Sequence, residues 1–292
     1  MNVFELLAPE IQNAIKKMGF EEPTEPQVEA IPPILQGKNV LLIAPTGYGK
    51  TEGVIFPVFD QFLKLKDKMS GIGILYITPL RALNRDLLKR LEWLGKELGI
   101  PVMVRHGDTT TAERRLQAQK PPMMLITTPE TLQAILPGKI LKEYLRNVRW
   151  VIVDEIHELA EDERGAQLSI ALERLLELTG REFQRIGLSA TIGAPEVVAK
   201  FLVGDRPVEI VKISASHLME LKVESPFPTL NDKELAPQLF TTPSAVSRIR
   251  RMRELIEQHT SVLTFVNTRE MAEIIGSRMK VWDQNFPLEV HH

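Results

Sequence analysis

Short, almost continuously apolar runs alternate along this chain with longer segments in which leucine and alanine recur at helical spacing. The apolar runs cover residues 40–44, 72–78, 123–127, 150–153, 185–189 and 262–266. Strands buried on both faces have this continuous hydrophobicity, as in a parallel sheet covered by helices. Residues 80–98 and 166–178 have the helical spacing. The pattern therefore predicts βαβ repetition and a doubly wound α/β domain.

The pattern also predicts two domains. The first is expected to span residues 1–215, and prolines at 226, 228, 237 and 243 predict an irregular connector over residues 216–243. An arginine-rich helix at 248–257 and the apolar run at 262–266 then begin a second α/β unit over residues 244–292. Since a usual domain has roughly 100 to 200 residues, we expect this second unit to be incomplete.

Composition narrows the class of protein without indicating a partner. The 292 residues are 43% hydrophobic and 25% charged, which is ordinary for a globular protein, and the net charge is −2. Binding to nucleic acid would therefore need local basic patches. The absence of cysteine excludes disulfides, zinc fingers and thiol catalysis. With no secretory signal and no run of 18 apolar residues in the sequence, we expect a cytoplasmic protein.

The candidate chemistry begins at PTGYGKT, directly after the first apolar run. Gly47 and Gly49 supply turn flexibility, and successive backbone N–H groups at a helix N-terminus form an anion site. Lys50 is expected to reach the β and γ phosphates, and Thr51 to place its hydroxyl on Mg²⁺. Where the strict pattern has glycine this chain has Ala44, and a glycine turn without ligand is the alternative. The candidate nucleotide-binding residues of the loop are Ala44, Pro45, Thr46, Gly47, Tyr48, Gly49, Lys50, Thr51 and Glu52.

Two adjacent carboxylates follow the buried run of RWVIVDEIHELAED. The carboxyl ends of parallel strands are where such sheets bind ligands. Asp154 is expected to hold Mg²⁺, and Glu155 to polarise the attacking water as general base. A solvated helix cap is the alternative. His157 is expected to couple the nucleotide site to a domain interface, although a lone histidine is more often structural.

With these two motifs in place, the chain resembles the superfamily 2 helicases. DEIH has the DExH form of their acidic box, and GLSAT (187–191) is similar to their third motif. GFEEPTEPQ (19–27) resembles the adenine-reading Q-motif. TPLRAL (78–83), TTPETL (127–132) and TFVNTR (264–269) resemble further motifs of the family. The combination of TPLRALNRD, RHGDTT and TTPE is most similar to the Lhr (large helicase-related) branch.

The resemblance implies a RecA-like P-loop NTPase domain with a parallel sheet flanked by helices, followed by the start of a second RecA-like domain. It implies that Gln27 bonds the adenine edge, that Phe20 packs on the base and that Thr24 supports both. An amide suits adenine because it can donate and accept. Ser189 and Thr191 are expected to link hydrolysis to movement through hydrogen bonds toward the DEIH box. With Lys50, Asp154, Glu155 and His157 they complete the expected catalytic set.

The resemblance also implies contacts to a nucleic-acid strand. Hydroxyls, backbone amides and an occasional arginine suit phosphates, which fix the position of the strand without reading its sequence. Ordinary strand ends and helix caps are the alternative for each residue by itself. The implied residues are Thr78, Pro79, Arg81, Gly107, Asp108, Thr128, Pro129, Glu130, Asn267, Thr268 and Arg269, with Arg105 nearby. The arginines 248, 250, 251 and 253 do not form one stripe, and we interpret them as a solvated helix face.

The resemblance thus implies an ATP-dependent helicase or translocase that uses ATP and Mg²⁺ on single-stranded or partly duplex nucleic acid, with DNA favoured and RNA as the alternative. The late arginine motif of the family, which completes the transition-state charge, is not found in this sequence. We therefore expect the chain to bind nucleotide with weak activity and to stop within the second domain. The competing interpretation is a non-catalytic nucleotide- and strand-binding module that acts through a partner. A small-molecule kinase is disfavoured, since DEIH and SAT have no place in that chemistry.

Overall fold

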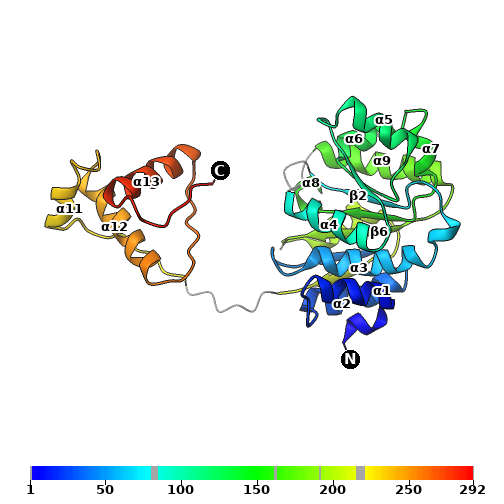
Figure 1. Ribbon diagram of the computed structural model, residues 1–292, viewed down its shortest axis with the longest axis horizontal. Coiled ribbons are helices and arrows are strands. Elements are labelled where there is room, and N and C mark those ends of the chain that lie inside the picture. The colour runs from blue at the N-terminus through cyan, green and yellow to red at the C-terminus, as the bar shows by residue number, and fades with distance from the viewer. Residues whose placement is uncertain (1, 80–84, 161–162, 191, 215–220, 292) are drawn as a thin grey trace. The chain divides into compact units, whose positions relative to one another are not determined.

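The computed structural model describes residues 2–79, 85–160, 163–190, 192–214 and 221–291 (Figure 1). The chain divides into two compact units, Met1–Ser216 and His217–His292. Among the described residues, no helix has both the length and the apolar character needed to cross a membrane.

The first unit is built on a parallel sheet with strand order β3-β4-β2-β5-β6-β1-β7. Because all its neighbouring strands are parallel, all its carboxyl ends lie along the same edge of the sheet. The seven strands are β1 (Val40–Ile43), β2 (Ile74–Ile77), β3 (Val102–Arg105), β4 (Met124–Thr127), β5 (Trp150–Val153), β6 (Gln184–Ser189) and β7 (Glu209–Lys212).

Helices connect these strands and cover both faces of the sheet (Figure 1). The elements are η1 (Val3–Leu6), α1 (Pro9–Lys17), α2 (Glu25–Leu35), α3 (Lys50–Leu63), η2 (Lys66–Lys68), α4 (Arg85–Glu97), α5 (Thr111–Gln119), α6 (Pro129–Ile135), α7 (Leu141–Leu145), α8 (Ile156–Ala160), α9 (Glu163–Thr179) and α10 (Pro195–Val203). The prediction of an α/β domain with a parallel sheet flanked by helices is confirmed.

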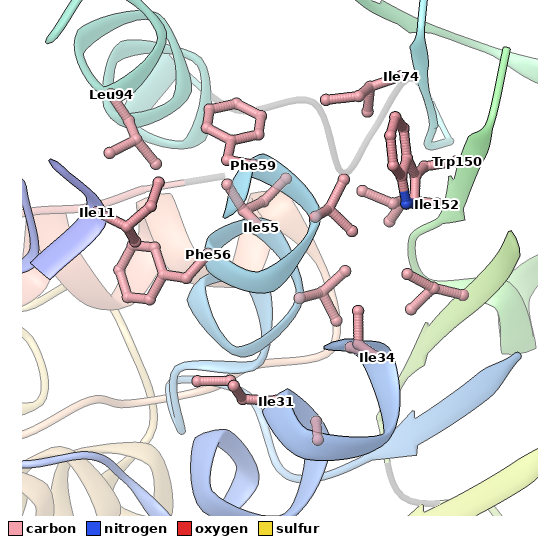
Figure 2. Packing of buried hydrophobic residues seen from close by; sticks show 14 of the residues in the cluster. Ile11, Ile31, Ile34, Ile55, Phe56, Phe59, Ile74, Leu94, Trp150 and Ile152 are labelled. Atoms are coloured by element: carbon pink, nitrogen blue, oxygen red, sulfur yellow. The ribbon is translucent and has the colours of Figure 1, made fainter. Parts of the chain in front are cut away.

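Two hydrophobic cores lie on the two faces of the sheet, because successive strand residues point to opposite sides. Leu42 belongs to the core that α1 to α4 cover, whereas its neighbour Leu41 belongs to the core that α6 to α10 cover. Figure 2 shows part of the first core, where Phe56 and Phe59 of α3 lie among side chains from α1, α2, α4, β2 and β5. Burial on both faces explains the unbroken apolar runs in the sequence.

Strands β3 and β7 were not predicted by the apolar pattern. They occupy the two edges of the sheet, and their residues are mostly half-buried. An edge strand has a neighbour on one side only, so the charged residues of VMVR and EIVK can stay partly exposed. The five predicted runs between residues 40 and 189 all contain central strands. The predicted helix at 80–98 corresponds to α4, and residues 80–84 lie outside the described residues.

The second unit contains α11 (Leu230–Leu235), α12 (Pro243–Glu257) and α13 (Arg269–Trp282). The prediction of an irregular connector was wrong over α11, which has a reciprocal cap between Thr229 and Asp232. The prediction of a strand at 262–266 was also wrong, since these residues form no regular element, are largely exposed and pair with no strand among the described residues. A strand needs neighbours for its backbone hydrogen bonds, and the described residues of this unit provide none.

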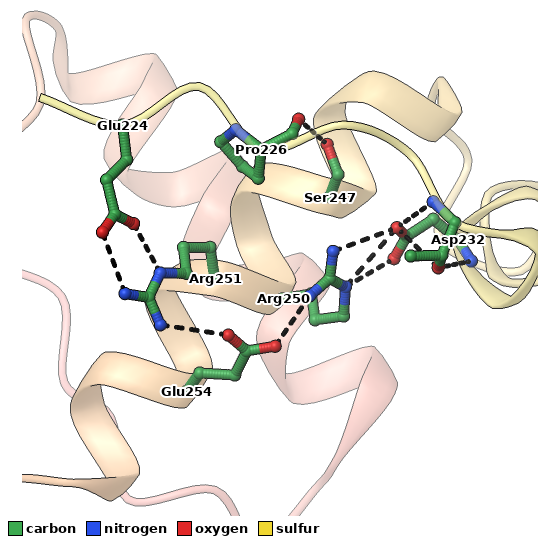
Figure 3. A network of polar contacts seen from close by, with 8 residues as sticks. Glu224, Pro226, Asp232, Ser247, Arg250, Arg251 and Glu254 are labelled. Atoms are coloured by element: carbon green, nitrogen blue, oxygen red, sulfur yellow. Dashed lines mark hydrogen bonds and ion pairs between the residues drawn. The ribbon is translucent and has the colours of Figure 1, made fainter.

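Arginines of α12 take part in ion pairs, and Figure 3 shows those of Arg250 and Arg251. Arg250 bonds Asp232 at 3.0 Å, and Arg251 bonds Glu224 at 2.5 Å, with Glu254 between the two guanidinium groups. Hydrogen bonds from Arg251 and, to a lesser extent, Lys222 lower the pKa of Glu224 to about 2. Arg253 pairs with two further carboxylates and lies over two aromatic rings. The side chains of Arg250, Arg251 and Arg253 keep 23 to 29% of their surface exposed, so this helix face is solvated as interpreted, and carboxylates of the second unit neutralise their charges.

Candidate nucleotide site and strand-binding edge

The motif residues of the first unit meet along the carboxyl edge of the sheet. Strand β6 lies between β5 and β1, so Ser189 at its end stands between Asp154 and the loop that follows β1. The Ala44 amide donates to the Ser189 carbonyl at 3.2 Å. The Asp154 amide likewise donates to the Ile77 carbonyl of β2 at 2.8 Å. Three motifs that are far apart in the sequence are thus placed side by side by strand order alone.

The loop from Ala44 to Gly49 turns the chain from β1 into α3. Gly47 and Gly49 have φ angles of 84° and 76°, in the left-handed region that favours glycine. Gly49 is the N-cap of α3 and makes no side-chain cap, so the first N–H groups of this helix remain for another acceptor. This is the geometry of a phosphate cradle.

Lys50 begins α3 and folds back over the loop. Its Nζ donates to the carbonyl oxygens of Ala44 at 2.6 Å and Pro45 at 3.2 Å, and the residue is 8% exposed. Burial lowers the pKa of the amine, while the carboxylates of Glu155 and Asp154 pull it upward. The cation therefore lies within the field of the acidic pair.

The predicted Q-motif residues hold the loop from behind. The Thr24 hydroxyl donates to the Tyr48 carbonyl at 2.9 Å, and Gln27 Nε2 donates to the Gly49 carbonyl at 3.3 Å. Gln27 Oε1 accepts from the Thr24 amide at 3.0 Å, as part of the cap of α2. Gln27 is fully buried. Both ends of its amide are thus bonded within the protein, so the adenine contact stays a prediction while a contact to the loop is present.

Asp154 is held by two donors from different parts of the chain. The buried Tyr76 hydroxyl donates to Oδ2 at 2.5 Å, and the Glu155 amide donates to Oδ1 at 2.9 Å. Burial raises the pKa of Asp154 to about 6, against the lowering effect of the Tyr76 hydrogen bond. Burial, together with Asp154, also raises the pKa of Tyr76, which keeps its hydroxyl a donor. Sequence reasoning missed Tyr76, whose one signal is a hydroxyl inside the otherwise apolar strand ILYI.

Glu155, His157 and Ser189 form a polar chain beside Asp154. Glu155 Oε2 lies 3.5 Å from His157 Nδ1, and the same nitrogen lies 3.2 Å from Ser189 Oγ. The hydrogen bond expected from Ser189 toward the DEIH box is therefore present. Glu155 has a φ of 46°, a conformation that costs a non-glycine residue on the order of 1 to 3 kcal/mol. This turn places two successive carboxylates at the strand end.

The oxygen donors of the site fit Mg²⁺. The described residues contain no group of three or more His, Asp or Glu side chains able to hold a metal by themselves. Mg²⁺ in nucleotide sites typically uses one or two protein oxygens together with substrate phosphates and water. The hydroxyl of Thr51, one residue into α3, and the fixed carboxylate of Asp154 have the required chemistry.

Two further predicted residues support α3 in the structure. Phe20 is half-buried, and its ring makes an edge contact with Phe56 at 6.0 Å between centroids. Glu52 is 6% exposed and forms an ion pair with Arg90 of α4. Their proposed contacts with nucleotide remain predictions. Pro45 and Thr46 lie in the loop, whereas Thr191 lies outside the described residues.

The predicted strand-binding residues of the first unit follow β2, β3 and β4, which adjoin β5 along the same edge. Thr78 and Pro79 are buried after β2, and Arg81 lies outside the described residues. Gly107 and Asp108 are exposed after β3. The strand ends thus share one edge of the sheet with the nucleotide site.

After β4, helix capping accounts for part of the predicted motif. Thr128 caps α6, where its hydroxyl accepts from the Thr131 amide, and Pro129 is the first residue of that helix. Glu130 is exposed and pairs with Arg164 at 2.5 Å. These residues therefore have structural partners, and their contact with a strand stays a prediction.

In the second unit, Asn267, Thr268 and Arg269 lie at the start of α13. Thr268 caps this helix by accepting from the Met271 amide at 3.1 Å, and Arg269 is its first residue. All three are accessible at the surface. Their structural role is a helix start, and their role toward a strand remains a prediction.

Comparison with known families decides the class of this site. The DEAD/DEAH box helicase family model matches residues 24–199, which contain the loop, the acidic pair and Ser189. The chain belongs to the DEAD/DEAH box helicases. The resemblance to superfamily 2 helicases noted from its motifs is confirmed.

Within this helicase family, the chain is similar to Lhr proteins. It is 38% identical to the ATP-dependent helicase Lhr-Core protein 2 of Thermococcus barophilus, over 99% of this chain and 35% of that protein. It is 40% identical to the ATP-dependent helicase Lhr-Core of Methanothermobacter thermautotrophicus, over 89% of this chain and 32% of that protein. The chain therefore spans about a third of the length of these relatives.

Solved structures of helicases share the fold. The helicase Lhr of Mycobacterium smegmatis, determined with single-stranded DNA and AMP-PNP, matches 96% of this chain and 36% of its own with a TM-score of 0.76 and 34% identity. The DUF1998 helicase MrfA bound to DNA and AMPPNP matches 72% of this chain and 29% of its own with a TM-score of 0.62 and 26% identity.

Proposed function

We propose that this chain carries the ATP-binding and ATP-hydrolysing part of a motor that moves along a nucleic-acid strand. The observation that carries the proposal is the convergence of Lys50, the Asp154–Glu155 pair and Ser189 at three neighbouring strand ends. A motor needs these groups close together, because it must bind the phosphates of the nucleotide, hydrolyse the nucleotide and pass the change on to other parts of the chain. The membership of the chain in a helicase family supports the proposal.

Each group has a distinct task in hydrolysis. The N–H groups at the start of α3 and the Lys50 amine bind the phosphates. To do so, Lys50 gives up its hydrogen bonds to two loop carbonyls and donates to phosphate oxygens instead. Thr51 and Asp154 would hold Mg²⁺, which would supply positive charge to neutralise the phosphates. Glu155 accepts the proton of the attacking water. Burial of the site strengthens each of these interactions.

Coupling to movement would pass through His157 and Ser189. Glu155 touches the imidazole that in turn touches Ser189, so a change in the charge of Glu155 alters a hydrogen bond of β6. A histidine nitrogen can donate or accept in this position, depending on its proton. Through this contact, hydrolysis at Glu155 would change the hydrogen bonding of Ser189 at the end of β6.

The strand substrate is a single-stranded or partly duplex nucleic acid, with DNA favoured over RNA. Support for DNA comes from the similar helicases Lhr and MrfA, whose structures contain it. The strand would run along the ends of β2, β3 and β4 and contact phosphates without reading bases. We place this activity in the cytoplasm, and we expect the chain by itself to be weakly active.

Steady-state ATPase assays of the 292-residue chain, with and without single-stranded DNA or RNA, test the proposal. We expect stimulation by a strand, and a loss of about 100-fold or more in Lys50→Ala and Glu155→Gln. Glu158→Gln is the matched control, because this exposed glutamate lies on α8 three residues away. Nucleotide and strand binding without any ATPase that depends on Lys50 and Glu155 would instead favour a non-catalytic binding module.

A further inference from the structure

A small basic cavity lies between the end of β3, helix α5 and the segment that joins α6 to α7. Its volume is about 300 Å³, and three of its lining side chains are cationic. None of its lining residues carries a carboxylate. The cavity is lined by Arg105, Arg114, Ala118, Ala134, Ile135, Gly138, Lys139, Ile140 and Leu141.

The two arginines of this cavity have no acidic partner among the described residues. Arg105 donates to the amide oxygen of Gln117 at 3.3 Å. Arg114 donates to the carbonyls of Thr109 and Gly107, both at 2.9 Å. Burial and the neighbouring Arg114 charge lower the pKa of Arg105, so the two guanidinium groups lie close enough to repel each other. An anion between them would relieve this repulsion and use their remaining N–H donors.

The remaining walls limit the kind of anion. Alanine, isoleucine and leucine side chains form the sides, and the exposed Lys139 lies at the rim next to Gly138. A compact tetrahedral anion fits such a volume, and guanidinium groups bind phosphate oxygens in pairs. The chemistry is therefore that of an oxyanion site, and a phosphate group has the compact tetrahedral shape for it.

The position of the cavity indicates where the phosphate comes from. Arg114 is bonded to Gly107, and Arg105 is the last residue of β3, directly before the predicted strand-binding turn. We propose that Arg114 and Lys139, which lie outside the motifs, join Arg105 of the RHGDTT motif in a subsite for a backbone phosphate of the bound strand. This inference rests on the proposed nucleic-acid function and extends its interface toward the β3 edge of the sheet.

Charge reversal at the rim tests the subsite with little risk to folding. In fluorescence anisotropy with a labelled 20-nucleotide single-stranded DNA at several salt concentrations, we expect Lys139→Glu to weaken binding at least fivefold. The slope of log K against log salt should fall by about 0.7 for each phosphate that the protein no longer neutralises. Arg114→Gln is expected to act in the same direction. Lys120→Glu is the matched control, since this exposed lysine follows α5 without lining the cavity and reports long-range charge.

The outcomes separate the subsite from the proposed function. Equal weakening by Lys139→Glu and Lys120→Glu would overturn the subsite, and so would unchanged binding in all variants. Absence of strand binding by the unaltered chain would overturn both proposals. A free nucleotide as the occupant is tested with labelled ADP, whose affinity we expect to be the same in Lys139→Glu and the unaltered chain. A loss of ADP affinity in that variant alone would contradict a strand subsite.

Discussion

Asp154 must carry charge at a place that disfavours charge. It is 7% exposed, and burial raises the pKa of its carboxyl group to about 6. The hydroxyl of Tyr76 and the amide of Glu155 offset part of this cost. These two hydrogen bonds also fix the orientation of the carboxylate. Each of its oxygens keeps a further lone pair, which can bind a hydrated metal ion. The buried charge that function requires at Asp154 therefore destabilises the native state.

The cost of this charge can be measured as a dependence of stability on pH. Since the native pKa of Asp154 lies above its unfolded value, the native state loses stability as pH rises through about 4 to 6. We expect Asp154→Asn to increase the free energy of unfolding at pH 8 by up to about 3 kcal/mol. The gain should be small at pH 4 and vanish below about pH 3, where Asp154 is neutral in both the folded and the unfolded state.

Denaturant unfolding at pH 4 and pH 8 provides this measurement. Asp67→Asn is the control, because it removes an equal charge from an exposed site. An Asp154→Asn chain that is no more stable than the unaltered chain at pH 8 would show that the two donors offset the burial completely.

At the scale of elements, α2 and the phosphate loop act as one structure. Thr24 and Gln27 bond two carbonyls of the loop, and they lie where a side chain at Gly49 would project. An added Cβ would lie 2.7 Å from Gln27 Nε2 and 3.2 Å from Thr24 Oγ1. The glycine is thus needed both for its φ angle and for the close approach of α2.

Gly37 allows these two requirements to be separated. It has nearly the same φ, 77°, yet an added Cβ would meet nothing within 4 Å. Alanine in this conformation costs roughly 1 to 2 kcal/mol at either site. We expect Gly49→Ala to lose at least about 1 kcal/mol more than Gly37→Ala, and to lose nucleotide binding, which Gly37→Ala should keep. Unfolding curves and labelled-ADP titrations of the two variants decide this, and equal effects would refute a role for the α2 contact.

The whole molecule consists of two units of unequal internal order. The first has a seven-stranded sheet with a core on each face. The described residues of the second have three helices, two small apolar clusters and an exposed apolar segment at 262–266. The backbone of this segment pairs with no strand among the described residues.

Amide hydrogen exchange distinguishes the two kinds of apolar segment. We expect the amides of residues 262–266 to exchange within seconds to minutes in the 292-residue chain, and those of β1 to be protected as strongly as global unfolding allows. The reason is that central strand amides are bonded on a buried sheet, whereas this segment has no ladder. Strong protection at 262–266 would show that it pairs in solution with a strand from elsewhere.

The local pattern by itself determined much of this protein. Continuous apolar runs predicted the central strands, since burial on both faces favours apolar residues and admits a charge such as Arg185 of β6 only with a partner, here Glu173. The loop around Lys50 and the pair at Asp154 were readable because their chemistry needs certain residue types at short spacing. Apolar runs and short motifs depend only on residues that are close in the sequence, so they can be identified from the sequence directly.

Only the tertiary structure decided the rest, because it depends on which elements meet. Edge strands β3 and β7 form because each pairs with one neighbouring strand. The apolar run at 262–266 forms no strand because the described residues give it no neighbour. Tyr76 became part of the site when β2 paired with β5. Gln27, expected at adenine, bonds Gly49 because α2 lies against the loop. Strand order and helix packing are long-range choices, and no short stretch of sequence records them.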